Sequence, residues 1–205
     1  MKYDVVSFDL QGTLSDSRFS DDFWIKILPE LFSIKNNISL DQAKEKLKKY
    51  FKKIGQYDYR YYSTDYWISE LSPGSSFKKI SRKIKHPPYF YKDSLALIKS
   101  LKKANKKLII ISSTTYDFIN LELGEYKKYF DAVFSSWDDF HVAGKPVILY
   151  KKIAQALNVK PNKILHIGDS KTMDIDNAEK AGCGVFYFDK KQPRKVLLSR
   201  LKNIL

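Results

Sequence analysis

The stretch that decides the fold is F-D-L-Q-G-T-L, residues 8–14. Residues 3–8 (Y-D-V-V-S-F) have the composition of a buried strand. Asp9 ends that strand and is followed by a glycine and a threonine, a layout typical of a reactive carboxylate at the tip of a sheet. Gln11 stands where a second carboxylate would complete an acid–base pair, and an amide cannot transfer a proton. The stretch therefore predicts a chemical site and raises the question of what Gln11 leaves possible.

Length and composition restrict the class of protein. The chain has 205 residues, of which 43% are hydrophobic and 29% charged, which suits a soluble domain with a smaller insertion. No apolar run approaches the ~20 residues that span a bilayer, and the N-terminal residues lack the features of a signal peptide. A single cysteine, Cys183, cannot form an intrachain disulfide. We therefore expect a cytoplasmic protein.

The charge balance is strongly basic. Lys and Arg total 37 and Asp and Glu total 23, which gives a net charge of +14. Such a field attracts phosphorylated metabolites, nucleic acid or acidic membrane surfaces. The lysines are spread along many predicted helices instead of being gathered in one arm, which is equally typical of a general compositional bias. The charge by itself therefore does not select a partner.

From residue 92 onward, the sequence alternates between helix and strand patterns. Continuous β-branched runs such as residues 108–111 predict strands buried on both faces. The predicted helices are 93–104, 116–123, 146–157 and 174–182, and the predicted strands are 107–112, 131–136, 163–170 and 184–189. His166, inside one strand, is expected to be packed and hydrogen-bonded. The alternation predicts an α/β protein with a doubly wound parallel sheet.

Residues 16–86 have a different, helical character. We expect a first helix with Ser20 or Asp21 as its N-cap and a second one capped by Ser39. An aromatic-rich loop and helix follow at residues 57–71, and a last helix at residues 77–85 ends before two prolines. The pattern predicts a helical cap domain, residues 16–86, inserted into a core domain made of residues 1–15 and 87–205.

Polar side chains gather where the predicted strands end, which is where ligands bind to such sheets. The sequence places there three carboxylates, a hydroxyl and a lysine: Asp9, Asp169, Asp174, Ser112 and Lys145. Clustered carboxylates repel one another unless a cation lies among them, and one lysine does not balance three. An all-oxygen, partly hydrated site suits Mg²⁺, which we expect as the cofactor.

In this order, these residues resemble the motifs of the haloacid dehalogenase-like (HAD) hydrolase superfamily. The four motifs read D-L-Q-G-T at 9–13, I-I-I-S-S at 109–113, G-K-P at 144–146 and G-D-S-K-T-M-D at 168–174. The insertion after the first motif is similar to the family's small mobile cap. The resemblance covers almost the whole chain. It implies a phosphatase-like hydrolase for a small phosphorylated metabolite, as a monomer or homodimer without nucleic-acid or membrane partners.

The resemblance also implies the catalytic and metal-binding roles. Asp9 would be the nucleophile that forms an aspartyl-phosphate, and Lys145 would neutralise charge between Asp9 and the phosphoryl group. Mg²⁺ would be held by Asp9, the main-chain carbonyl of Gln11 and Asp169. Asp174 would support the ion through water, orient Lys145, or cap the following helix.

Four further residues are implied at the substrate. Ser112 would hold a phosphoryl oxygen, with Ser113 and Thr13 beside it. Arg18, just past the first motif, would meet a distal anionic group of the substrate. One or two aromatic side chains of residues 57–67 could face the cleft and stack on a ring.

Gln11 takes the place of the aspartate that serves as general acid and base in the family's phosphatases, a loss of a factor of ~10²–10⁴. Three interpretations stay open. The first is a phosphohydrolase that is slow or restricted to good leaving groups such as acyl or aryl phosphates. The second is a dehalogenase-like or phosphonate-cleaving hydrolase, which the retained carboxylates of the last motif disfavour. The third is an inactive member that binds a phosphorylated ligand or a protein. The first predicts that Gln11→Asp raises turnover of an alkyl phosphate.

Overall fold

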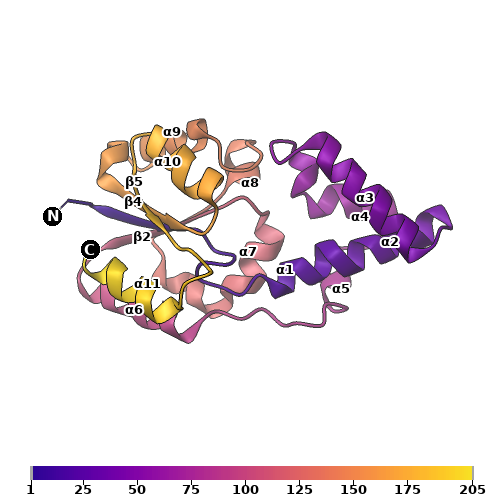
Figure 1. The fold of residues 1–205 in the computed structure, drawn as a ribbon, viewed down its shortest axis with the longest axis horizontal. Coiled ribbons are helices and arrows are strands. Elements are labelled where there is room, and N and C mark those ends of the chain that lie inside the picture. Colours follow the sequence, from indigo (N-terminus) through magenta and orange to yellow (C-terminus); the bar gives the residue numbers. More distant parts are fainter. Residues whose placement is uncertain (1, 205) are drawn as a thin grey trace.

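The computed structural model describes residues 2–204, and its centre is a parallel sheet (Figure 1). The strands are β1 (Val5–Phe8), β2 (Lys107–Ser112), β3 (Ala132–Ser135), β4 (Ile164–Gly168) and β5 (Gly184–Tyr187). They lie in the order β3-β2-β1-β4-β5, so the chain begins in the middle strand and extends the sheet to both sides. The doubly wound parallel sheet predicted from the sequence is confirmed.

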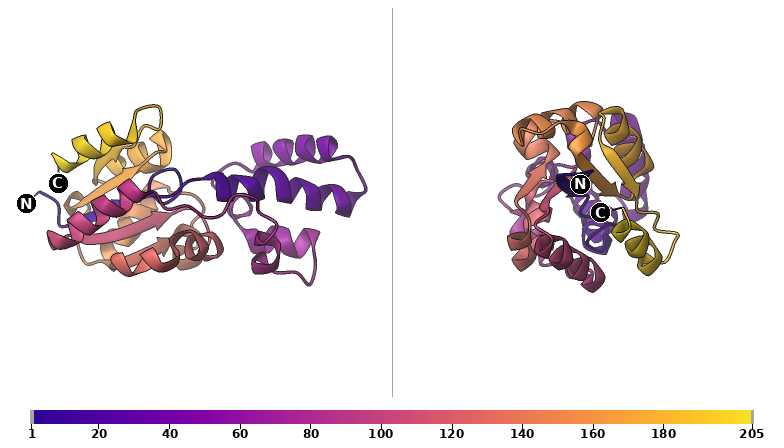
Figure 2. Two further views of the ribbon diagram at one scale, coloured as in Figure 1. Left: turned by 90° about the horizontal axis from the view of Figure 1, so that it is seen from below. Right: turned by 90° about the vertical axis from the view of Figure 1, so that its left-hand side faces the viewer.

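Helices cover both faces of this sheet (Figures 1 and 2). The helices of this part are α6 (Lys92–Lys103), α7 (Tyr116–Leu123), α8 (Ser136–Phe140), α9 (Val147–Ala156), α10 (Asn177–Lys180) and α11 (Arg194–Lys202). Val6 packs in one apolar cluster with side chains of α6 and α11, whereas Val5 packs in the other with side chains of α9 and α10. Neighbouring strand residues point to opposite faces, which is why all of β1 is apolar or small.

The α-helices that follow β1 and precede α6 project beyond the carboxyl ends of the strands (Figure 2). They are α1 (Arg18–Asp22), α2 (Leu28–Asn36), α3 (Leu40–Ile54), α4 (Thr64–Leu71) and α5 (Phe77–Ser81). A π-helical turn at Phe23–Ile27 joins α1 to α2. This arrangement supports the proposed division into core and cap, whose boundaries stay a prediction.

Two predicted ends in this helical part are wrong. The first helix begins at Arg18, so Ser20 and Asp21 lie inside it, and the Ser20 hydroxyl donates to the carbonyl of Ser17 at 2.9 Å instead of capping the helix. The last helix, α5, ends at Ser81 instead of residue 85. The capping of α3 by Ser39 is confirmed, with Gln42 completing a reciprocal pair of hydrogen bonds.

Two α-helices of the core were not predicted. Helix α8 is a single short turn after β3, too brief to show a periodic pattern. Helix α11 buries an apolar stripe of Leu197, Leu198 and Leu201 against the sheet. Its many charged residues make this stripe hard to recognise in the sequence. Among residues 2–204, no helix is long and apolar enough to span a bilayer.

Candidate active site

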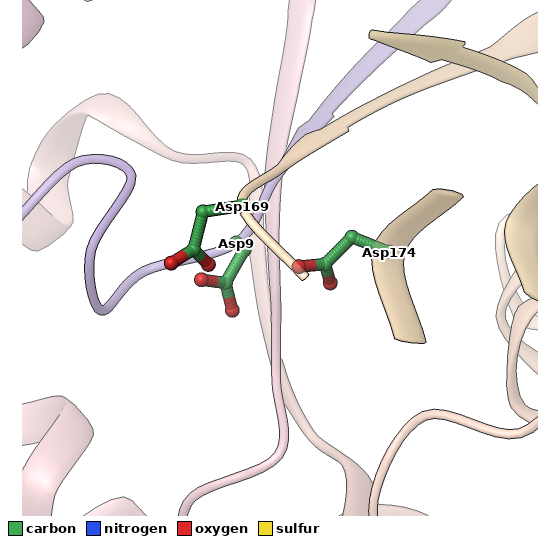
Figure 3. A group of neighbouring side chains, drawn as sticks. All are labelled: Asp9, Asp169 and Asp174. Atoms are coloured by element: carbon green, nitrogen blue, oxygen red, sulfur yellow. The ribbon is translucent and has the colours of Figure 1, made fainter. Parts of the chain in front are cut away.

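Three carboxylates meet at the carboxyl end of the sheet (Figure 3). Asp9 directly follows β1 and Asp169 directly follows β4, and the pairing of these strands brings both residues to one edge. Asp174 lies in the π-helical turn Lys171–Asp176 that follows β4. One oxygen of each carboxylate lies within 4.8 Å of those of the other two. The structure thus brings together the acidic residues that the sequence placed at this edge.

Lys145 lies between two of these carboxylates and is 2% exposed. Its Nζ contacts Asp9 and donates to Asp174 Oδ1 at 2.6 Å. Burial alone would lower the pKa of Lys145, but Asp174 and Asp9 raise it, so the ammonium keeps its charge. For Asp9, burial raises the pKa to about 8, helped by the neighbouring carboxylates and opposed by Lys145. Burial therefore disfavours the ionised form of Asp9 more strongly than Lys145 favours it.

Buried hydrogen bonds hold Asp174 from the sheet side. His166 Nε2 lies 3.1 Å from Asp174 Oδ1, and His166 Nδ1 lies 2.9 Å from Ser7 Oγ. A carboxylate only accepts, so Nε2 carries the proton and the Ser7 hydroxyl donates to Nδ1. Burial lowers the pKa of His166, which keeps the ring neutral. Although burial opposes it, Lys145 and His166 lower the pKa of Asp174, which stays ionised.

Asp169 contacts a cation of its own. Lys190, in the loop after β5, contacts the Asp169 carboxylate through Nζ and keeps 57% of its side chain exposed. Gly12 lies beside this pair with φ +80°, where a Cβ would stand 2.5 Å from Asp169 Oδ2 and 2.9 Å from Lys190 Nζ. Both the backbone conformation and the space therefore require glycine at this position.

The acidic cluster fits a divalent cation. Asp9, Asp169 and Asp174 line a cavity of about 130 Å³ together with Gln11, Ser112, Ser113, Ser170, Met173 and Lys145. The three carboxylates offer oxygen atoms as ligands, and Mg²⁺ prefers oxygen ligands. Lys145 contacts both Asp9 and Asp174, so a single buried ammonium serves two of these carboxylates. Asp174 already bonds Lys145, which corresponds to the orienting role that the resemblance left open.

The predicted substrate-binding residues divide into two groups. Ser112 and Ser113 line the cavity beside Asp9, and Ser112 Oγ also accepts from the amide of Thr114 at 3.3 Å. Thr13 is buried outside the cavity lining. The guanidinium of Arg18 pairs with Asp16 at 2.7 Å on the surface. The structure therefore does not bring the side chains of Thr13 and Arg18 to the cavity.

Comparison with known proteins identifies the family. Residues 6–188 match the family described as haloacid dehalogenase-like hydrolase. The chain belongs to this family. It is 26% identical over 184 residues to the GMP/IMP nucleotidase YrfG of Escherichia coli K12, covering 87% of this chain and 79% of that protein.

Solved structures share the fold of this haloacid dehalogenase-like chain. The crystal structure of a HAD phosphatase from Thermococcus onnurineus has a TM-score of 0.79 and 22% identity, with 100% of this chain and 97% of that one covered. A predicted phosphoglycolate phosphatase from Haemophilus somnus has a TM-score of 0.64 and 16% identity, with 100% and 99% covered. At these identities, the likeness supports the haloacid dehalogenase-like fold.

In this haloacid dehalogenase-like hydrolase, the side chain of Gln11 is held by a residue that the sequence analysis missed. Glu122, on α7, accepts from Gln11 Nε2 at 2.5 Å and from Ser15 Oγ at 2.7 Å. Its side chain is buried, and burial raises its pKa to about 7 against the effect of these two donors. Glu122 lies 111 residues from Gln11 along the chain. The sequence around Glu122 has only the pattern of an ordinary helix, so it does not indicate a contact with Gln11.

A second, more apolar cavity of about 340 Å³ lies next to the carboxylate cavity of this haloacid dehalogenase-like chain. It is lined by Gln11, Ser20, Asp21, Trp24, Ile25, Phe51, Tyr61, Tyr62, Ser113 and Thr114. Gln11 and Ser113 line both cavities, so the two are neighbours. Of the aromatic residues at 57–67 expected near the cleft, Tyr61 and Tyr62 line it, whereas Tyr66 and Trp67 pack in the helical part.

Proposed function

We propose that the protein is a Mg²⁺-dependent phosphohydrolase that forms an aspartyl-phosphate on Asp9. One observation carries the proposal: the carboxylates of Asp9, Asp169 and Asp174 lie together at the end of the sheet, and the buried Lys145 contacts Asp9 and Asp174. Membership of the hydrolase family and the 26% identity to a nucleotidase support the same conclusion.

In this mechanism, a carboxylate oxygen of Asp9 attacks phosphorus, and the bond from phosphorus to the leaving oxygen breaks. Lys145 lies against Asp9 and offsets the repulsion between its carboxylate and the phosphate. Water then attacks phosphorus, the bond to Asp9 breaks, and the carboxylate is restored. The proton lost by water goes to inorganic phosphate, and the leaving oxygen takes its proton from solvent.

The oxygen donors would hold Mg²⁺. Asp9 and Asp169, with the main-chain carbonyl of Gln11, would be its protein ligands, and Asp174 would hold Lys145 in place beside them. When bound, the ion supplies positive charge to the phosphoryl oxygens and to the Asp9 carboxylate. Ser112, which lines the same cavity, would donate to a phosphoryl oxygen.

Gln11 sets the range of leaving groups. An amide cannot protonate the leaving oxygen, so esters with acidic leaving groups are favoured over alkyl phosphates. The neighbouring cavity with Trp24, Phe51, Tyr61 and Tyr62 suits a planar leaving group. An aryl phosphate satisfies both conditions, and a purine nucleotide, as the name of the E. coli relative suggests, satisfies the second.

The test is turnover of p-nitrophenyl phosphate, acetyl phosphate and GMP with Mg²⁺ and with EDTA. We expect Mg²⁺-dependent release of phosphate, fastest from the first two substrates. Asp9→Asn should abolish it, with a loss of at least about 10³-fold. Binding of beryllium trifluoride only when Mg²⁺ is present and Asp9 is intact would support the phospho-enzyme.

Two outcomes would favour the alternatives. Mg²⁺ and phosphate binding without turnover of any of the three substrates would indicate an inactive, ligand-binding member. Release of halide from a 2-haloacid, or cleavage of a phosphonate, without phosphatase activity would indicate the dehalogenase-like or phosphonate-cleaving alternative. Either result would overturn the proposed phosphohydrolase.

A further inference from the structure

We propose that Glu122 is a positioning residue. It holds the side chain of Gln11 in one orientation, and it favours an amide over a carboxylate at position 11. The inference rests on the proposed function where it concerns turnover. It is carried by the contact of 2.5 Å between Gln11 Nε2 and Glu122 Oε1, at a place where the two cavities adjoin.

The hydrogen-bond donors around Glu122 determine which side chain can face its carboxylate. One oxygen accepts from Gln11 and the other accepts from Ser15 Oγ at 2.7 Å. Within residues 2–204, no lysine, arginine or histidine forms an ion pair with Glu122. A buried carboxylate without a cation depends on such neutral donors. The amide of Gln11 is therefore part of what makes a carboxylate at position 122 tolerable.

The same contact settles which way the amide of Gln11 faces. The hydrogen bond from Nε2 to Glu122 Oε1 turns the Nε2 end of Gln11 toward Glu122, which is the direction that an ionised carboxylate requires. The Oε1 end then points away from Glu122, and within residues 2–204 it forms no other hydrogen bond, while Gln11 itself lines the carboxylate cavity. That oxygen is an acceptor, and it can orient a water molecule for attack on the phosphorus of the aspartyl-phosphate. The amide takes no proton, which passes to the phosphate product.

This pairing changes what is expected of Gln11→Asp. The substitution removes the amide donor and places a second carboxylate close to Glu122, in a buried setting where like charges repel strongly. We therefore expect Gln11→Asp alone to gain little on alkyl phosphates, unlike the expectation from the sequence. The gain should require Glu122→Gln in the same chain, because the new amide can then donate to the new carboxylate.

The experiment is a double-mutant cycle of Gln11→Asp and Glu122→Gln, measured by thermal unfolding and by turnover. Gln11→Asp should lower the unfolding midpoint by at least about 4 °C, and Glu122→Gln in the same chain should restore most of it. Glu122→Gln alone should lower kcat for p-nitrophenyl phosphate about 10-fold with KM changed less than about twofold, since the amide loses its fixed direction. The double variant should exceed the wild type on an alkyl phosphate by about 10²-fold.

The matched control is Glu125→Gln, an exposed glutamate just beyond the same helix, which should change neither quantity. Additive effects of the two substitutions on the midpoint, or an unchanged kcat for Glu122→Gln, would overturn the inference. The unfolding cycle needs no activity, so it tests the pair even if the wild type proves inactive. Failure of the proposed function is recognised separately, as absence of turnover in the wild type with Mg²⁺.

Discussion

At the scale of single residues, the site is a balance between one buried ammonium and several carboxylates. Lys145 contacts Asp9 and Asp174, both of them buried, and the imidazole of His166 supports the second from the sheet side. Removing one member of a buried charge network leaves the others uncompensated, at a cost of about 3–5 kcal/mol. The free energy of unfolding should therefore depend on the cations that neutralise the carboxylates at this end of the sheet.

Lys145→Met should lower the free energy of unfolding by about 3 kcal/mol when measured in EDTA, because Asp9 and Asp174 lose their shared cation. Mg²⁺ should restore part of the loss, since a ligand that binds only the folded state stabilises it. Urea unfolding with and without Mg²⁺ measures both effects. Lys190→Met is the control, because Lys190 is 57% exposed and its pair with Asp169 should contribute less than about 1 kcal/mol. Equal stability of the Lys145 variant and the wild type in EDTA would contradict this account.

At the scale of elements, α7 links the sheet, the site and the helical part. Its Glu122 holds Gln11, and its Asp117 accepts from Thr64 Oγ1 of α4 at 2.5 Å. Its Phe118 is fully buried and packs in one apolar cluster with Phe23 and Phe77 of the helical part. Successive faces of one short helix thus contact both parts of the chain, so a change in α7 should affect both.

Phe118→Ala should lower the free energy of unfolding by about 3–5 kcal/mol, because its ring meets those of Phe77, Phe23 and Phe19 at centroid distances of 4.7, 5.6 and 5.9 Å. It should also speed hydrogen exchange in α1 and α5 more than in β1, since Phe19 lies in α1 and Phe77 in α5. Chemical unfolding and exchange mass spectrometry measure the two effects. Phe118→Leu keeps most of the apolar volume and should lose less. Uniform exchange changes across the chain would show that α7 does not hold the helical part specifically.

At the scale of the whole molecule, the helical part lies over the site and is tied to the core by two paired connections. The amide of Asp16 donates to the carbonyl of Tyr89 at 2.9 Å, and that of Tyr91 donates to the carbonyl of Leu14 at 3.0 Å. Farther along, the backbone of Gln56 approaches Gly144 so closely that a Cβ there would stand 2.9 Å from its carbonyl oxygen. This contact places the helical part against the loop that carries Lys145.

Asp22 joins the outgoing and returning connections, because its Oδ2 accepts from both the amide and the ring Nδ1 of His86. The hydrogen bond from Lys26, followed by those from His86, lowers the pKa of Asp22 to about 2. A lowered pKa adds stability above the unfolded pKa of about 4, and this stability disappears as the pH falls toward 2. Because Lys26 is half exposed, screening reduces the contribution to about 1 kcal/mol.

Asp22→Asn should therefore be less stable than the wild type by about 1 kcal/mol near pH 5, and the difference should shrink as the pH falls below about 3. Urea unfolding over this pH range measures it. Asp41→Asn is a suitable control, because Asp41 is almost fully exposed and its lysine lies 3.9 Å away. A stability difference that stays constant down to low pH would mean that the charge of Asp22 does not act in this way.

The sequence by itself determined the parallel sheet and the edge at which Asp9, Ser112, Lys145, Asp169 and Asp174 would gather. These features depend on local patterns: buried strands, the helices between them, and polar residues directly after strand ends. The order of the strands then places those ends side by side. Helix ends such as those of α1 and α5, and the charged helix α11, were less predictable because packing against the sheet or the aromatic cluster decides them.

Only the tertiary structure decided the partners of each side chain. Strand register sets His166 opposite Ser7 and beneath Asp174, and the packing of α7 sets Glu122 against Gln11. The tertiary structure also shows that Arg18 forms an ion pair with Asp16 and that Lys190 forms one with Asp169. Except for the pairs of Arg18 with Asp16 and of His166 with Asp174, these contacts join residues that are far apart along the chain. The sequence gives their charges but not the distances between them.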